Sequence, residues 1–186
     1  MSRISKVDLS NPESVEFDNS GRSAAYFCKR NPVSVDSQLI SELKDESVRL
    51  GGNNIRLCLH ESPESNLHEM INLEHRNKYN PPHKHAIKGE SYHIIEGSMA
   101  AFVFDDDGTV ADASILEPKD NFLYRVGVNM YHAVIPVTDV IIYHETRPGP
   151  FSREGDSLFP TWAPDGSDPK ESEAFISSLL RLLEVK

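Results

Sequence analysis

The sequence predicts an all-β protein, an antiparallel sandwich or barrel with helical additions at its N-terminal and C-terminal ends. Short apolar segments separated by turn residues fill the region from residue 55 to residue 146, and a helix-like pattern lies on either side of them. Many short strands at even spacing are typical of sandwiches and barrels. The length of 186 residues suits one compact domain with terminal additions.

Residues 1–52 are expected to form a loosely held polar arm, a short strand at residues 24–28 and a helix. Asp36 is a suitable N-cap for a helix that continues to about Arg49, where a pair of glycines follows. The expected apolar face of this helix consists of Leu39, Ile40, Leu43 and Val48.

Residues 53–150 are expected to form the barrel. Asp106-Asp107-Gly108 lies between two strand-like segments and is a good hairpin signal. The alternation of apolar segments with turn residues predicts strands near residues 55–59, 69–79, 90–96, 99–104, 110–116, 121–126, 132–136 and 139–146.

Residues 151–186 are expected to form an extension and a helix. Pro160 and Pro164 prevent regular structure in the first part. A helix is predicted over about residues 169–184. Its apolar stripe should pack on the barrel or on a second subunit and not on a membrane, because the helix carries few basic residues. The stripe consists of Phe175, Ile176, Leu179, Leu180 and Leu183.

The composition excludes several classes of partner. A net charge of −10 without a basic patch argues against nucleic acid and anionic membranes, and no apolar run approaches the ~18 residues needed to cross a bilayer. The N-terminus lacks the apolar core of a secretory signal, so a cytoplasmic location is expected. Cys28 and Cys58 fit neither a disulfide scaffold nor a zinc finger and are expected to be packed thiols.

Four residues have the chemistry and spacing of a metal site. His83 and His85 are two residues apart, so on an extended chain they project to the same face. Glu90 follows a short turn and starts the next strand, where its carboxylate can reach the same point. His132 ends a turn that leads into an apolar strand. We expect these four side chains to bind one ion.

The ligand types indicate a divalent transition metal. Imidazole nitrogens with one carboxylate suit Zn, Fe, Ni, Cu or Mn, and ligand type alone does not choose among them. Four protein ligands on a six-coordinate ion leave two positions for water or substrate, which favours a catalytic over a purely structural site.

The same residues resemble a known pair of motifs. His83-X-His85-X4-Glu90-X6-Gly97 resembles the first cupin motif, and Gly127-X-Asn129-X2-His132 resembles a degenerate second motif, usually Pro-X-Gly-X2-His. Asn can adopt the positive φ that Gly would supply at residue 129. The resemblance to the cupins, within the RmlC-like superfamily, implies a double-stranded β-helix, or jelly-roll, barrel.

Further segments narrow the resemblance to the WbuC-type cupin metalloproteins, over about residues 53–166. That family is encoded with bacterial surface-polysaccharide genes, so the resemblance implies a metal-binding cupin in a sugar-related setting. It does not imply a particular reaction. The segments are Asn54-Ile55-Arg56, Leu59-His60, Asn72, Tyr79, Phe104-Asp105-Asp106-X-Gly108, Arg147-Pro148-Gly149-Pro150-Phe151 and Trp162-Ala163-Pro164.

Proton transfer beside the ion is assigned to Glu90, Tyr92 and Tyr131. Tyr92 shares the inward parity of Glu90, although a core tyrosine is an equal alternative, and Tyr131 precedes a ligand. His93 lies three residues from Glu90 and should face the opposite side. Lys88 is expected to be a charge at the rim.

Substrate contacts are assigned to Tyr124, Arg125 and His144, which lie on or beside strands that should line the barrel. An inward Arg125 would suit a carboxylate or phosphate of a ligand, whereas an outward one would be a solvated strand residue. The sequence leaves the parity of Arg125 and His144 open.

Three functions fit these features. The first is a metal-dependent isomerase or epimerase acting on a sugar or nucleotide-sugar. The second is an Fe(II)-dependent dioxygenase, because cupin sites of three His and one Glu also activate dioxygen. The third is a non-catalytic cupin that binds a small sugar-like molecule. The C-terminal apolar stripe also makes a homodimer plausible.

Overall fold

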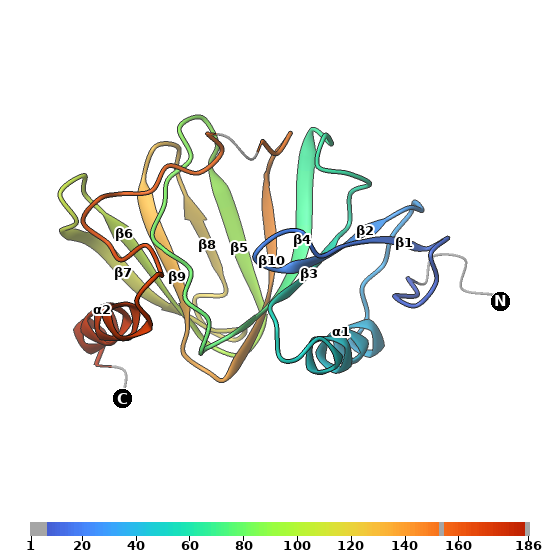
Figure 1. Cartoon of the computed structure of the whole chain (residues 1–186), viewed down its shortest axis with the longest axis horizontal. Helices are drawn as coiled ribbons and strands as arrows, with labels where there is room; N and C mark the ends of the chain where they lie inside the picture. Colours follow the sequence, from blue (N-terminus) through green and yellow to red (C-terminus); the bar gives the residue numbers. More distant parts are fainter. Residues whose placement is uncertain (1–6, 153–154, 185–186) are drawn as a thin grey trace.

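The computed structural model describes residues 7–152 and 155–184 and consists of two facing β-sheets with a helix beside each (Figure 1). The larger sheet has the strand order β1-β2-β3-β4-β10-β5-β8, and the smaller has the order β7-β6-β9. In Figure 1 the sheets approach each other at the lower end of the view and separate at the upper end. This arrangement confirms the predicted all-β class, two packed, largely antiparallel sheets with helical additions at both ends of the chain.

The larger sheet contains β1 (Val15–Asp18), β2 (Ala24–Cys28), β3 (Ile55–Cys58), β4 (Leu67–His75), β5 (Glu90–Glu96), β8 (Leu123–Val126) and β10 (Val140–Pro148). The smaller sheet contains β6 (Met99–Phe104), β7 (Val110–Leu116) and β9 (Tyr131–Pro136). All strand pairs are antiparallel except β2 with β3, which is parallel. Strand β10 pairs with both β4 and β5, so it joins β5 and β8 to the N-terminal half of the sheet.

The N-terminal arm contains structure that the sequence pattern did not predict. Strand β1 lies within the polar segment expected to be loosely held, and it pairs with β2 over four residue pairs. Val15 is buried in the core, but the next two residues are exposed, so the short strand shows no alternation of buried and exposed residues.

Strand β4 ends at His75, earlier than the predicted residue 79.

Alternation along the strands separates an inner from an outer face. Between the two sheets lies an apolar cluster that includes Tyr92, Ile94, Met99, Ile141 and Tyr143. The outer face of β3 and β4 is instead covered by the first helix, and the outer face of β6 and β9 by the second. The interior is therefore apolar where the sheets pack together, and polar side chains at the other inward positions line the remaining space.

Helix α1 (Ser37–Arg49) begins as predicted, because the Asp36 side chain accepts a hydrogen bond from Leu39 N at 2.9 Å. The prediction that Val48 belongs to the apolar face is wrong, since this side chain is 74% exposed. Ser47 takes the buried place, and its hydroxyl lies 2.7 Å from both Asn53 O and His75 Nε2.

Helix α2 (Pro169–Leu182) also begins as predicted, with Asp168 as N-cap and proline at its first position. Its apolar stripe packs on the outer face of β6 and β9, where Leu179 and Leu180 are buried against a cluster that includes Phe102 and Ile135. The stripe therefore gives no argument for a homodimer, which stays a prediction.

Among the described residues, no helix is long and apolar enough to span a membrane. Cys28 and Cys58 are both free and buried, as expected for packed thiols, and burial raises the pKa of Cys28 to about 11.

The turn after β5 gives a test of the fold. Gly97 has φ 83°, and an added Cβ would lie 2.6 Å from both Thr138 Oγ1 and Val140 O. Gly97→Ala should therefore lower the free energy of unfolding by about 3 kcal/mol, from left-handed strain and from steric overlap. Gly51 is a matched control, because its φ is 78° but no atom lies within 4 Å of an added Cβ. Gly51→Ala should cost only about 1 kcal/mol. Equal losses in urea denaturation would contradict the packing of this turn.

Candidate metal centre

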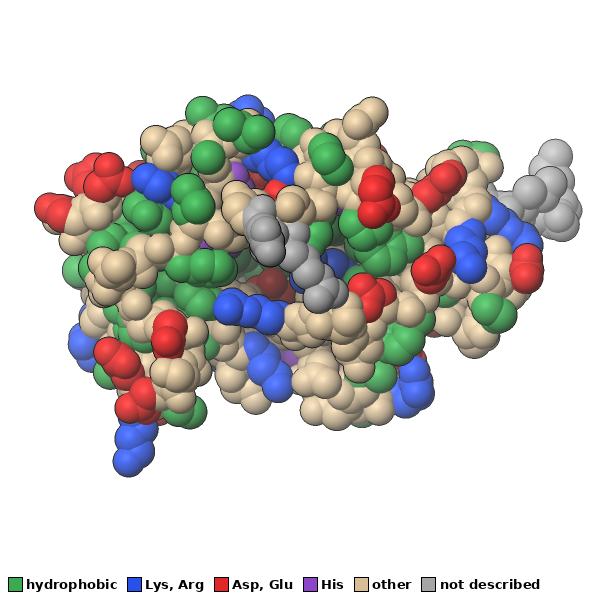
Figure 2. Space-filling model, turned by 45° about the horizontal axis from the view of Figure 1, so that its top comes forward, with side chains coloured by type: hydrophobic (Ala, Val, Ile, Leu, Met, Phe, Trp, Pro, Cys, Tyr) green, Lys and Arg blue, Asp and Glu red, His purple; other side chains and the backbone are tan. Residues whose placement is uncertain are grey.

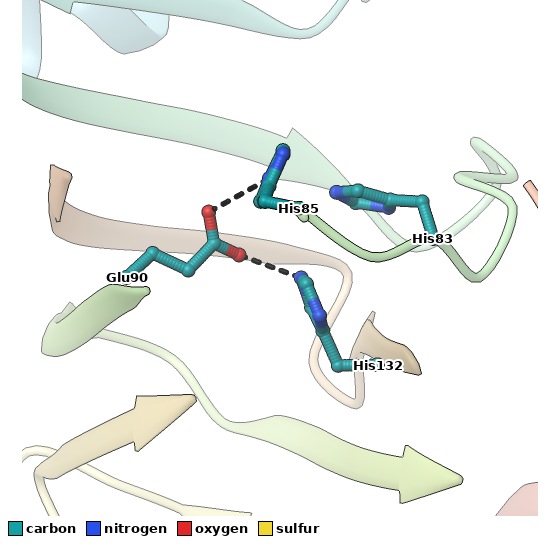
Figure 3. A group of neighbouring side chains, drawn as sticks. All are labelled: His83, His85, Glu90 and His132. Atoms are coloured by element: carbon teal, nitrogen blue, oxygen red, sulfur yellow. Dashed lines mark ion pairs between the residues drawn. The ribbon is translucent and has the colours of Figure 1, made fainter. Parts of the chain in front are cut away.

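The four predicted ligands lie together at one end of the barrel. One ligand atom from each of His83, His85, Glu90 and His132 lies within 4.8 Å of the others, and Figure 3 shows their side chains converging. His83 and His85 precede β5, Glu90 begins it, and His132 is the second residue of β9. The sequence motifs therefore bring together side chains from both sheets.

Backbone hydrogen bonds hold the two motifs against each other. His83 N donates to His132 O at 3.0 Å and His132 N donates to His83 O at 2.9 Å, which forms an isolated antiparallel bridge. Asn129 N donates to His85 O at 2.7 Å. Asn129 has φ 57°, so it adopts the positive φ expected of this degenerate motif.

Each imidazole is oriented by a hydrogen bond from its Nδ1 to a backbone carbonyl. His83 Nδ1 donates to Pro81 O at 3.2 Å, and His132 Nδ1 donates to Met130 O at 2.9 Å. His85 Nδ1 donates to the carbonyl of Asp156. A proton held on Nδ1 leaves the lone pair on Nε2, the tautomer that binds a metal.

The carboxylate of Glu90 completes the set. Its Oε2 lies 3.3 Å from His85 Nε2, and its Oε1 lies 2.7 Å from His132 Nε2. The second contact is close but lacks hydrogen-bond geometry, so the buried His132 Nε2 has no hydrogen-bond partner among the described residues. An unpartnered buried nitrogen beside a carboxylate and two further imidazoles fits a transition-metal ion.

At two of the four ligands, the pKa shift favours the form that binds a metal. Burial lowers the pKa of His83 to about 4, so this imidazole is neutral at pH 7. Burial opposes ionisation of Glu90, but its contacts with His132 and His85 outweigh that effect and lower its pKa. Neutral imidazole and ionised carboxylate are the forms that ligate a metal.

Tyr92 is the one predicted neighbour that the structure places against a ligand. Its hydroxyl donates to Glu90 Oε1, and the side chain is buried on the inner face of β5. Tyr124 pairs with Tyr92 across β5 and β8, so it shares this face, but its hydroxyl donates to Asp112 of β7.

The other predicted neighbours lie away from the ligands because of strand alternation. Tyr131 is adjacent to His132 and faces the opposite side of β9, where it contacts Trp162 and Lys84. Arg125 is exposed on the outer face of β8. His144 also faces outward on β10, 3.8 Å from Glu69 and opposite His93. The structure therefore does not bring these three residues to the cluster.

A charged network beside His85 was not predicted from the sequence. The Asp156 carboxylate lies 3.2 Å from Arg147 Nη1 and also pairs with Lys88. Arg147 Nη1 is in turn 3.3 Å from His85 Nε2. Lys88, expected at the rim, has a side chain that is only 12% exposed. The signal for Arg147 was its place in the Arg-Pro-Gly-Pro segment, whereas nothing in the sequence marked Asp156.

Two more carboxyl groups lie on the inner face farther along β4 and β10. Glu145 Oε2 accepts from Asn72 Nδ2 at 2.8 Å. Glu74 accepts from Tyr143 Oη at 3.0 Å and from Asn80 Nδ2 at 3.1 Å. Burial raises the pKa of Glu74 to about 7, and burial together with the charge of Glu90 raises the pKa of Glu145. The carboxyl group of Glu74 can thus exchange a proton near neutral pH.

Comparisons with known proteins give one family model, which covers less than half of the chain. A model described as a domain of unknown function (DUF6016) matches residues 35–116. No curated protein matches the chain.

The solved structures that resemble the chain share little of its sequence. The capsular polysaccharide assembling protein CapF from Staphylococcus aureus is 12% identical, with 56% of this chain and 29% of that chain covered and a TM-score of 0.49. A variant of oxalate decarboxylase OxdC from Bacillus subtilis is 16% identical, with 68% and 32% covered and a TM-score of 0.46. KdgF from Halomonas sp. is 14% identical, with 54% and 82% covered and a TM-score of 0.42. The chain thus spans under a third of CapF, and these similarities support no conclusion about its activity.

The weakest of the four assignments in the sequence, His132, gives a direct test of the metal centre. His132→Ala should lower metal affinity at least as much as the ~10–100-fold loss typical of changes to outer-shell partners. The control is His93→Ala, which removes an exposed imidazole from the outer face of β5. Elemental analysis after dialysis should find about one equivalent of metal in His93→Ala and much less metal in His132→Ala. Equal metal content in both variants would exclude His132 as a ligand.

The raised pKa of Glu74 predicts a pH-dependent effect on stability. The Glu74 carboxyl group keeps its proton up to about pH 7 in the folded chain, whereas its ordinary pKa is 4.5. The group therefore contributes stability at low pH, and this contribution is lost as the pH rises through about 7. The difference corresponds to roughly 3 kcal/mol. Glu74→Gln should therefore gain stability relative to the wild type between pH 5 and pH 8. Urea denaturation of both proteins at several pH values measures this gain. A difference in the free energy of unfolding between Glu74→Gln and the wild type that does not change with pH would contradict the raised pKa of Glu74.

Proposed function

We propose that the chain binds one divalent transition-metal ion and acts as a metal-dependent isomerase or epimerase on a sugar or nucleotide-sugar. The observation that carries the proposal is the common orientation of three imidazoles. Their Nδ1 atoms donate to backbone carbonyls and their Nε2 atoms face one ionised carboxylate. This donor set suits Zn, Fe, Ni, Cu or Mn.

Catalysis is favoured over a structural role by the number of ligands and by their neighbours. Four protein ligands leave open positions on a six-coordinate ion, where it would polarise a carbonyl or a pair of hydroxyls. Structural sites are more often closed by thiolate and imidazole ligands in a tetrahedron. Here the two cysteines lie elsewhere, in the packing around β2 and β3.

Proton transfer is assigned to groups on the inner face of the larger sheet. Tyr92 holds a proton against Glu90 Oε1, within the ligand set. Glu145 faces inward on β10 opposite Tyr92, and Asn72 positions its carboxyl group. A phenol and a carboxylic acid on adjacent strands can exchange a proton with a substrate bound between them.

The sugar class of substrate is supported by the sequence resemblance to WbuC-type cupins and by the polarity of the interior. Asn72 pairs with Glu145 on the inner face, and Asn80 and Tyr143 donate to Glu74, but each amide and carboxyl group has further donor or acceptor capacity. The hydroxyl groups of a sugar can use that capacity, whereas an apolar ligand cannot.

A pair of matched tyrosine variants tests the proton-transfer role. Tyr92→Phe should lower kcat by about 10²–10⁴-fold on the best substrate of a nucleotide-sugar and sugar panel, while metal content is unchanged. Tyr131→Phe should have nearly the wild-type kcat, because Tyr131 faces Trp162 on the other side of β9. Product formation is followed by NMR. No turnover by the metal-loaded wild type on any member of the panel would count against an isomerase or epimerase.

The identity of the active metal separates this proposal from a dioxygenase. Activity with redox-inert Zn under anaerobic conditions is the expected result, since isomerisation consumes no oxygen. A requirement for Fe(II) and dioxygen would instead establish the dioxygenase alternative. A sugar that co-purifies unchanged and is never converted would favour a binding cupin.

A further inference from the structure

Arg147 is a buried cation whose hydrogen bonds are incomplete. The residue is 8% exposed and lies at the C-terminal end of β10. Its Nε has no hydrogen-bond partner among the described residues, and the Glu145 Oε1 atom lies 3.6 Å from it. An unpartnered buried donor is costly, so an acceptor is expected to approach it.

The contact between Arg147 and His85 conflicts with metal binding. Arg147 Nη1 lies 3.3 Å from His85 Nε2, and because a guanidinium only donates, Nε2 must be the acceptor. His85 Nδ1 donates to Asp156 O, so Nε2 carries the single lone pair of that ring. The same lone pair is the metal ligand. When the ion binds, Arg147 therefore loses this acceptor; Nη1 keeps its hydrogen bond to Asp156 Oδ2 at 3.2 Å, and Nε still has no partner among the described residues.

The charges at the site favour an anion as the replacement acceptor. Arg147, Lys88 and a divalent ion together carry four positive charges, and they face the carboxylates of Glu90, Glu145 and Asp156. The positive charge exceeds the negative even when all three carboxyl groups are ionised. Figure 2 shows acidic side chains deep in a recess at this end of the barrel, with basic side chains beside them.

We propose that Arg147 determines substrate specificity by binding a carboxylate that also ligates the metal, so that the substrate is a sugar acid. This inference rests on the metal site of the proposed function, and it narrows the substrate class. A hydroxy acid would offer a carboxylate and a neighbouring hydroxyl as additional ligands to an ion held by the four side chains. The planar guanidinium matches the geometry of a carboxylate better than that of a hydroxyl group.

Isothermal titration of the Zn-loaded full chain with gluconate and with sorbitol tests the proposal. Gluconate has a carboxylate at the position where sorbitol has a hydroxymethyl group, and the two molecules are otherwise alike. Gluconate should bind the wild type at least 10-fold more tightly than sorbitol. Arg147→Gln should weaken gluconate binding roughly 10- to 100-fold and leave sorbitol binding unchanged. Equal affinity of the wild type for both probes, or equal affinity of wild type and variant for gluconate, would overturn the proposal.

Metal affinity provides a readout that a merely structural role would not give. Removing Arg147 removes a competitor for the His85 lone pair and a positive charge, so Arg147→Gln should bind Zn at least as tightly as the wild type. Weaker Zn binding by a folded Arg147→Gln variant would contradict the competition. If that variant does not fold, as judged by circular dichroism, Arg147→Lys is used, and wild-type gluconate affinity in it would overturn the role of the guanidinium.

Two controls keep this proposal distinct from the proposed function. Arg181→Gln changes an exposed arginine of α2 and should leave both titrations unchanged. Metal-free wild type should bind gluconate weakly, and affinity equal to that of the Zn-loaded protein would overturn joint recognition by the ion and Arg147. A chain that holds no metal fails the proposed function itself, whereas a chain that holds metal but does not prefer gluconate fails only the sugar-acid inference.

Discussion

The orientation of three imidazole rings is the constraint on which the rest of the site depends. Carbonyls of Pro81, Met130 and Asp156 fix the Nδ1 protons, and the backbone bridge between His83 and His132 fixes the distance between the two motifs. A rotation of any ring would direct Nδ1 instead of Nε2 at the centre. The metal chemistry therefore depends on backbone groups that a list of four ligands does not include.

One of these backbone contacts links the metal ligands to the charged network. The Asp156 carbonyl orients His85, while the carboxylate of the same residue pairs with Arg147 and Lys88. Arg147 in turn reaches His85 Nε2. Because the ion and Arg147 use the same lone pair, metal loading and the position of the guanidinium are coupled. Such coupling gives a physical reason for the ion to alter what the site recognises.

Much of the site was readable from the sequence because the chemistry is local. His83, His85 and Glu90 lie within eight residues. The alternation of side chains along an extended chain and the short turn before Glu90 direct all three side chains to one point. His132 required a degenerate turn, and the positive φ of Asn129 shows why that turn still works. The fold class was also readable, since short strands and two capped helices have local signals.

What was not readable depends on contacts between distant segments. Asp156 lies in a bend beyond the end of β10, and only the folded chain brings it to His85. The parity of Arg125 was open because apolar residues precede it at Phe122 and Leu123, both of which are exposed. Ser47 replaced Val48 on the buried face of α1 because its hydroxyl has partners in the loop after the helix and in β4. Local pattern cannot supply such partners.

A crystal structure of the metal-loaded chain, with anomalous data collected at the metal edge, tests the central claim most directly. The account predicts one anomalous peak about 2.0–2.2 Å from the Nε2 atoms of His83, His85 and His132 and from a carboxylate oxygen of Glu90. It also predicts that Arg147 no longer donates to His85. A peak elsewhere, or ligation through Nδ1, would contradict it.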